Sequence, residues 1–125
     1  MKAYQRYFEQ VQSKLKIVFG QKEKIEQAAD WVADCLANEG FIYTSGTGHS
    51  HIFAEEIFYR AGGFARVVAI LDEALMLHKD ASFSTEVERR EGYAARLLEE
   101  FPLSEKDVFI ISSNSGRNTV SIEMA

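Results

Sequence analysis

The stretch FIYTSGTGHSHIFAEE, from Phe41 to Glu56, joins a short apolar run to a turn of glycine, serine and histidine, and then continues with helical spacing. This pattern predicts a strand, a tight turn and a helix. A second stretch, VFIISSNSGRNTVSIEMA from Val108 to Ala125, repeats the same order. Neither turn contains a lysine or a cysteine. The two turns therefore need a common explanation.

Composition limits the classes of protein that the chain can belong to. Its 125 residues are 46% hydrophobic, which is enough for one domain with a buried core. A net charge of -5 argues against a nucleic-acid partner but not against a small anionic ligand. The single cysteine, Cys35, excludes an internal disulfide and suits a reducing compartment. The chain has no secretory signal and no apolar run of membrane-spanning length, so we expect a cytoplasmic protein without a membrane partner.

The first 39 residues have the spacing of two consecutive helices. Apolar residues recur every three or four positions, in one stripe that ends near Gly20 and a second that ends at Gly40. The first stripe consists of Tyr4, Tyr7, Phe8, Val11, Leu15 and Val18. We therefore expect a helical hairpin over residues 1–39. The first stripe is wider than a lone surface helix needs, so it packs either on the domain or on a second subunit.

From residue 40 onward, apolar runs alternate with helical spacing. The pattern predicts strands over 41–45, 66–72 and 107–113, and helices over 51–63, over 93–100 and from 118 onward. The last two strands are continuously apolar, as strands buried on both faces are. A polar segment, 73–92, is predicted to be a loop with broken helical turns.

Strands that alternate with helices predict an α/β fold, in which a parallel sheet lies between helices in a three-layer sandwich over residues 40–125. The whole chain, residues 1–125, is then a single domain. Its sequence stops at Ala125, inside a helix and soon after the third strand, which would leave an apolar sheet edge uncovered. We expect the sequence to be the first part of a longer protein; a partner that covers the edge is the alternative.

In such a sheet, ligands bind beyond the carboxyl ends of the strands, where both turns would lie. Glycine lets the backbone approach a ligand closely, and the first amides of a helix attract anions. The hydroxyls of Ser50, Ser113 and Ser115 can donate to phosphate oxygens. The two turns together therefore predict a site for a phosphate monoester, whose remaining part would reach toward His49, His51 or Arg117.

The sequence GTGHSHIFAEEIFYRAG resembles the first phosphosugar-binding turn of the sugar isomerase (SIS) domain family, and ISSNSGRN resembles the second. A small bacterial subgroup of that family is also similar at AGGFARVVAILDEALMLH and at STEVERREGYA, so the resemblance covers nearly the whole chain. It implies a five-stranded parallel sheet, a dimer or tetramer, and a sugar phosphate as ligand. The residues that it implies for binding are Gly46, Thr47, Gly48, Ser50, Ser113, Asn114, Ser115, Gly116 and Asn118. Many family members have threonine in place of Asn118, which leaves that contact open.

Two functions remain open for such a site. An aldose–ketose isomerase moves a proton between adjacent sugar carbons, and the candidate groups for this step are His49, Glu55, Glu56 and Glu88. A non-catalytic sensor would bind the same ligand without proton transfer. Neither function requires a cofactor or a metal ion.

Each candidate also has an ordinary structural explanation. Ser50 can simply cap the following helix, and His51, like His49, is more commonly a turn or surface residue. Glu88 and Arg89 would most simply belong to a structural ion pair.

A dinucleotide-binding fold is the weaker alternative. Gly46-Thr47-Gly48 begins a Rossmann fingerprint, and Asp72 lies where a ribose-binding acid would follow the next strand. His51 stands where that fingerprint requires its third glycine, and two helices precede the first strand.

Overall fold

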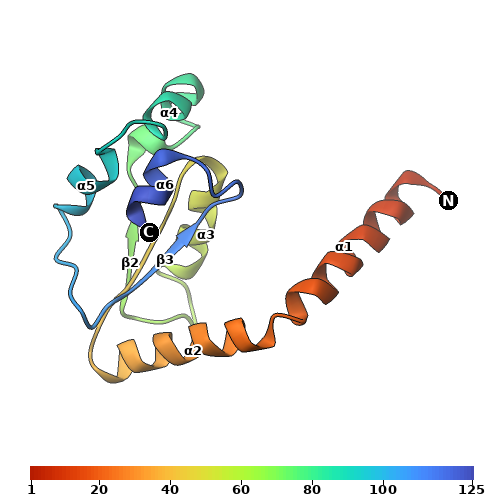
Figure 1. Cartoon of the computed structure of the whole chain (residues 1–125), viewed down its shortest axis with the longest axis horizontal. Coiled ribbons are helices and arrows are strands. Elements are labelled where there is room, and N and C mark those ends of the chain that lie inside the picture. The colour runs from red at the N-terminus through yellow and green to blue at the C-terminus, as the bar shows by residue number, and fades with distance from the viewer. The chain divides into compact units, whose positions relative to one another are not determined.

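The computed structural model describes residues 1–125, which form helices and parallel strands in alternation after two N-terminal helices (Figure 1). In chain order the elements are α1 (Ala3–Phe19), α2 (Lys22–Ala37), β1 (Ile42–Gly46), η1 (Gly48–Ser50), α3 (His51–Ile57), β2 (Val67–Ile70), η2 (Glu73–Leu75), α4 (Ala81–Val87), α5 (Tyr93–Leu98), β3 (Val108–Ser112) and α6 (Thr119–Met124). The chain divides into two compact units, Met1–Ala33 and Asp34–Ala125.

The second unit is built around a three-stranded parallel sheet in the order β2-β1-β3. The central strand β1 is buried along its whole length, and its first residue, Ile42, pairs with Val67 of β2 and Val108 of β3. At the other end, Gly46 pairs with Ser112. The predicted α/β fold with a parallel sheet between helices is therefore confirmed.

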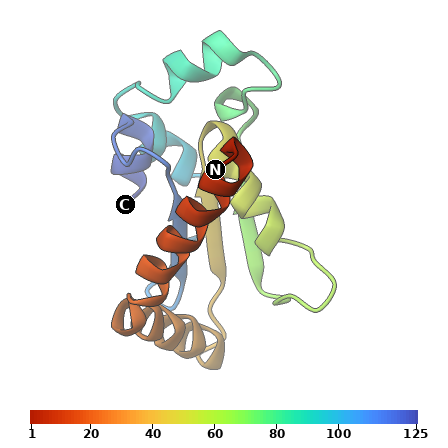
Figure 2. The same ribbon diagram turned by 90° about the vertical axis from the view of Figure 1, so that its right-hand side faces the viewer.

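Helices cover the two faces of this sheet (Figure 2). On one face, α3 packs across all three strands. On the other face, α5 and α6 pack against each other and against β3. The core on this second face consists of Leu75, Val87, Ala94, Val120 and Met124, with Phe109 and Ile111 of β3 packed against it. The helices between η2 and the end of α6 thus form one layer over the sheet.

Three predicted elements differ from the structure. The helix expected over 51–63 ends at Ile57, because Phe58 takes an extended conformation and Tyr59 has φ 46°, outside the helical region. The two strands expected to be buried on both faces are only partly buried: β2 is half-buried at its two middle residues, and β3 is half-buried at every position. Both lie at edges of the sheet, and each has β1 as its only neighbouring strand.

Both predicted N-terminal helices are present. The amide of Gly20 closes α1 by donating to the carbonyl of Lys16, and the next amide, that of Gln21, donates to the carbonyl of Val18. After α2, the amide of Gly40 donates to the carbonyl of Cys35 at 2.8 Å. Every residue of α1 is exposed, so its aromatic stripe faces outward. Neither helix, nor any other in the structure, combines the length and the hydropathy that a membrane span requires.

The paired starts of β1 and β3 are held by Asp107. One carboxylate oxygen accepts from the Phe41 amide at 2.7 Å, and the other accepts from the amide and hydroxyl of Ser104 at 2.7 and 2.9 Å. Burial acts to raise the pKa of Asp107, but the hydrogen bonds from the backbone of Phe41 and Ser104 outweigh it and lower the pKa below its ordinary value. The ionised carboxylate is therefore the form that the fold favours.

We expect Asp107→Ala to lower the free energy of unfolding by about 1–3 kcal/mol at pH 7, because two backbone amides lose a charged acceptor. Asp107→Asn retains part of the acceptor capacity and should lose less. Since folding lowers the pKa of Asp107, its stabilisation is complete above the unfolded pKa, near 4, and disappears as the pH falls through the lower folded value. Urea unfolding at pH 7 and at pH 2.5 measures this. A difference between wild type and Asp107→Ala that stays constant over this range would contradict the assignment.

Candidate functional site

Both glycine-serine turns lie at one end of the sheet. The first turn, residues 46–50, follows β1, and the second turn, residues 113–118, follows β3. Because β1 and β3 are parallel neighbours and end in the same register, at Gly46 and Ser112, the chain leaves both strands at the same edge (Figures 1 and 2). The tertiary structure thus places the two turns side by side, although more than 60 residues of sequence separate them.

The first turn depends on glycine at two positions. A β-carbon on Gly46 would lie 2.6 Å from the carbonyl carbon and oxygen of Ser50, so only glycine lets the start of α3 return so closely to the strand. Gly48 has φ 55°, in the left-handed region that glycine adopts without strain. The amide of Ser50 donates to the carbonyl of Thr47 at 3.0 Å and closes η1. The turn is therefore compact and leads directly into α3.

Ser50 precedes α3 at the N-cap position, but its side chain makes no capping hydrogen bond. Its backbone is already helical there, with φ -66° and ψ -19°, whereas a capping residue takes an extended conformation. The capping explanation for Ser50 is therefore wrong. The half-buried hydroxyl has no partner in the protein and remains free to donate.

The hydroxyls of the second turn accept from the turn itself. The Gly116 amide donates to the Ser113 hydroxyl oxygen at 3.0 Å, and the Arg117 amide donates to that of Ser115 at 3.3 Å. A hydroxyl that accepts a hydrogen bond keeps its own proton for donation. Both serines are exposed, so these protons can be directed to a ligand. Asn118 occupies the N-cap of α6 without a side-chain capping bond, and Asn114 is exposed.

Glu88 connects the first turn to the helix that follows the second. The Thr47 hydroxyl donates to Glu88 Oε2 at 2.9 Å, and the amide of Val120, in α6, donates to the Glu88 carbonyl at 3.0 Å. Thr47 is buried and Glu88 is half-buried. The ion pair expected for Glu88 and Arg89 is absent, because Glu88 is turned inward to Thr47 while Arg89 is exposed.

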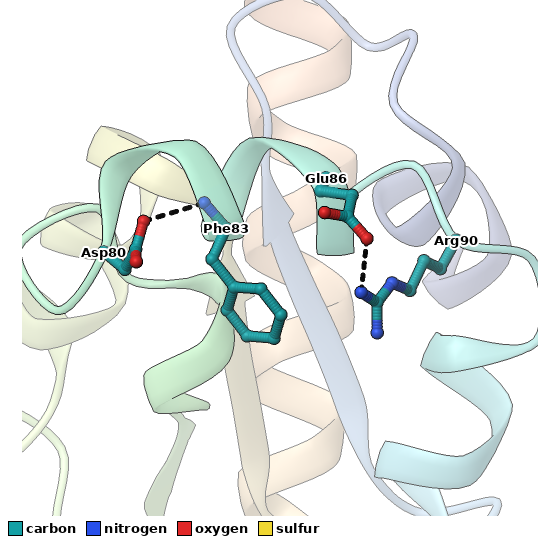
Figure 3. Close-up of polar contacts among 4 residues, drawn as sticks. All are labelled: Asp80, Phe83, Glu86 and Arg90. Carbon is teal, nitrogen blue, oxygen red and sulfur yellow. Dashed lines mark hydrogen bonds and ion pairs between the residues drawn. The ribbon is translucent and has the colours of Figure 1, made fainter.

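Glu88 directly follows Val87, the last residue of α4, and two of the contacts that hold this helix are drawn in Figure 3. Asp80 caps α4 by accepting from the Phe83 amide at 2.9 Å, and Arg90 pairs with Glu86 across the last turn at 2.5 Å. Val87, next to Glu88, is completely buried in the core. The helix is thus capped at one end and anchored by its core residue at the other.

His51 is also part of the site, although the sequence indicated a turn or surface residue. Its side chain is only 9% exposed, and Nδ1 is hydrogen-bonded to the carbonyl oxygen of Gly48. Nε2 lies 3.8 Å from Glu55, and the His78 ring lies 6.0 Å away between centroids. The signal in the sequence was the three-residue spacing between His51 and Ala54, both buried on the inner side of α3.

The remaining candidates for proton transfer are less closely connected to the turns. Glu56 forms an ion pair with Arg60 one helical turn away, and both side chains are more than half exposed. His49 is exposed and has no hydrogen-bond partner. Glu55 contacts His51 but neither turn directly. Of the four candidates, Glu88 is therefore the one whose carboxylate is bonded to a residue of the first turn.

Asp72, the expected ribose-binding acid of a dinucleotide fold, already has hydrogen-bond partners within the protein. One of its carboxylate oxygens accepts from the Ala74 amide at 2.8 Å, and the other accepts from the Tyr93 hydroxyl at 2.6 Å. Burial, together with this bond to Asp72, raises the pKa of Tyr93 to about 12. Asp72 thus has a structural role that a ribose would have to displace. No group of three or more His, Cys, Asp and Glu side chains has the arrangement of metal ligands.

We expect Thr47→Val and Glu88→Ala each to lower the free energy of unfolding by about 1–3 kcal/mol, because each removes one partner of a part-buried, charge-assisted hydrogen bond. The double variant should lose less than the sum of the two, with a coupling energy of about 0.5–3 kcal/mol in a double-mutant cycle. Urea unfolding measures all four proteins.

A matched control is Thr85→Val, which removes a threonine hydroxyl that bonds only to the Ala81 carbonyl on the exposed side of α4. It should change stability by less than about 0.5 kcal/mol. Fully additive effects of Thr47→Val and Glu88→Ala would show that the bond contributes nothing.

Comparison with known proteins identifies the family to which the chain is similar. The family model described as SIS domain matches residues 6–125. Two UPF0309 proteins of Halalkalibacterium halodurans are 43% and 44% identical over 120 and 122 residues, which are 95% and 98% of this chain and 48% and 50% of those proteins. A UPF0309 protein of Geobacillus thermodenitrificans is 42% identical over 121 residues, 96% of this chain and 49% of that protein. The chain spans about half the length of these relatives.

Proposed function

The chain belongs to the SIS domain family, and on that basis we propose that it binds a sugar phosphate between the turn after β1 and the turn after β3. The observation that carries this proposal is the arrangement of the turns: they leave one edge of the sheet in register, and Glu88 connects the first turn to α6, the helix that follows the second. A structural role for either turn alone would not require two neighbouring sets of free hydroxyl donors.

The phosphate is held in this proposal by uncharged donors. The hydroxyls of Ser50, Ser113 and Ser115 supply protons, and the amides of the two turns add further donors. Such a site needs no lysine and is compatible with a chain of net charge -5. The sugar then extends toward Thr47 and Glu88, on the side where the first turn contacts the end of α4.

We expect Ser113→Ala and Ser115→Ala each to weaken the binding of a hexose 6-phosphate by about 10- to 100-fold, because each removes a hydrogen bond to a charged oxygen. Isothermal titration calorimetry with a panel of hexose 6-phosphates and with inorganic phosphate measures this. Ser13→Ala, on the exposed surface of α1, is the control and should bind like the wild type. Unchanged affinity in both turn variants would exclude this site, whereas a wild type that binds no phosphate would exclude the function.

We further propose a catalytic role as an aldose–ketose isomerase, which the position of Glu88 supports. The carboxylate lies beside the first turn, where it would face the sugar carbons of a ligand whose phosphate is held by the serines. A carboxylate there can remove a proton from the carbon next to the carbonyl group and return it to the adjacent carbon. A sensor that binds without chemistry would need Glu88 only for its hydrogen bond to Thr47.

Glu88→Gln and Glu88→Ala distinguish these two roles. Glutamine still accepts from Thr47 but cannot take up a proton, so we expect it to bind hexose 6-phosphates within about threefold of the wild type and to lose at least about 100-fold in deuterium exchange at C2. Alanine should lose both binding and exchange. NMR in D₂O follows the exchange. Binding without exchange by the wild type would favour the sensor, and unchanged exchange in Glu88→Gln would exclude Glu88 as the base.

We also propose that the chain forms a cytoplasmic homo-oligomer, either a dimer or a tetramer. The support for an oligomer is the outward-facing aromatic stripe on α1, with Tyr4, Tyr7 and Phe8 all more than 60% exposed. An exposed apolar stripe of this kind is typical of helices that pack against another chain.

A further inference from the structure

His51 lies beneath the first turn, and neither the family resemblance nor the proposed phosphate contacts give it a role. It is the first residue of α3, and its side chain is 9% exposed. The groups around its ring are the Gly48 carbonyl, the Glu55 carboxylate and the His78 ring. A buried imidazole directed at the backbone of a ligand-binding turn requires an explanation beyond packing.

The hydrogen bond between His51 and Gly48 has a defined direction. A carbonyl oxygen only accepts, so Nδ1 of His51 must carry a proton and donate it. This holds for the charged ring and for the neutral ring that is protonated at Nδ1. The remaining nitrogen, Nε2, is the one that faces Glu55. The Gly48 carbonyl thus accepts from the side chain of His51 in addition to the backbone N–H at the end of η1, and the two bonds together fix its orientation.

The same bond also orients the next amide. The peptide between Gly48 and His49 is planar and trans, so its C=O and N–H groups point in opposite directions. With the carbonyl directed inward to His51, the His49 N–H points away from the imidazole, and this amide makes no hydrogen bond within the protein. Gly48, at φ 55°, has the freedom to rotate this peptide. The backbone bond to the Gly48 carbonyl and the side-chain bond from His51 together oppose that rotation.

We propose that His51 is a positioning residue, which holds the Gly48–His49 peptide so that the His49 amide donates to the phosphate bound at the first turn. This inference rests on the proposed binding of a sugar phosphate. His51 itself does not touch the ligand in this arrangement; it acts through the backbone.

Two substitutions separate this role from packing. His51→Phe keeps a planar ring but lacks the donor, whereas His51→Asn places an amide nitrogen where Nδ1 stood. We expect His51→Phe to raise the dissociation constant for a hexose 6-phosphate by about tenfold or more, and His51→Asn to stay within about threefold of the wild type. Calorimetric titration of the full chain measures both. A packing role predicts the reverse order, because phenylalanine preserves the ring volume better than asparagine.

A second measurement needs no ligand. A long-range ¹H–¹⁵N spectrum should show a proton on Nδ1 of His51, and the amide signal of His49 should move in His51→Phe but much less in His51→Asn. Equal affinities in wild type and His51→Phe, a larger loss in His51→Asn than in His51→Phe, or an unprotonated Nδ1 would each overturn the inference. A wild type that binds no phosphate ester would overturn the proposed function, while the spectrum would still report whether the His51 bond exists.

Discussion

The parallel pairing of β1 with β3 is the constraint on which the rest of the site depends. Its register brings Gly46 opposite Ser112, so that two turns distant in sequence begin at neighbouring points of one edge. The start of the pair is held by the Asp107 carboxylate, and its far end is linked through Glu88. A shift of one residue in this register would move every side chain of β3 to the opposite face and separate the two turns.

In addition to strand pairing, hydrogen bonds of Glu88 hold this edge of the sheet together. Its side chain is bonded to Thr47 and its backbone to Val120, so the ends of α4, the first turn and α6 are connected within one residue. Removing the Thr47 hydroxyl would leave the half-buried carboxylate without its hydrogen-bond donor, which destabilises the fold. The same carboxylate is the group to which we assign proton transfer in the proposed isomerase reaction. In this proposal Glu88 both holds the site together and transfers the proton. Only a substitution that still accepts the hydrogen bond from Thr47, such as Glu88→Gln, can separate the two roles.

The proposed site would let a chain with excess negative charge bind an anion. Its donors are hydroxyls and amides, whose orientation is fixed by the backbone rather than by long charged side chains. In the second turn, the amides of Gly116 and Arg117 donate to Ser113 and Ser115, which leaves the hydroxyl protons of both serines free to donate. In the first turn, Gly46 permits the close return of the backbone, and the Gly48 carbonyl accepts from both the backbone and the side chain of His51. The net charge of a chain therefore does not predict whether it binds such an anion, because binding depends on the local arrangement of hydroxyl and amide dipoles.

The sequence by itself determined the order of helices and strands, the parallel sheet and the two turns, because hydrophobic spacing and glycine placement are local properties of the chain. It did not determine that α3 ends at Ile57, since the conformations of Phe58 and Tyr59 are not encoded in apolar spacing. Only the tertiary structure decided that Glu88 meets Thr47, that Asp72 is occupied by Tyr93, and that His51 is buried. These contacts join positions on separate elements, or depend on which side of a helix faces the sheet. They are therefore fixed by the packing of the elements and not by the residues next to them in the chain.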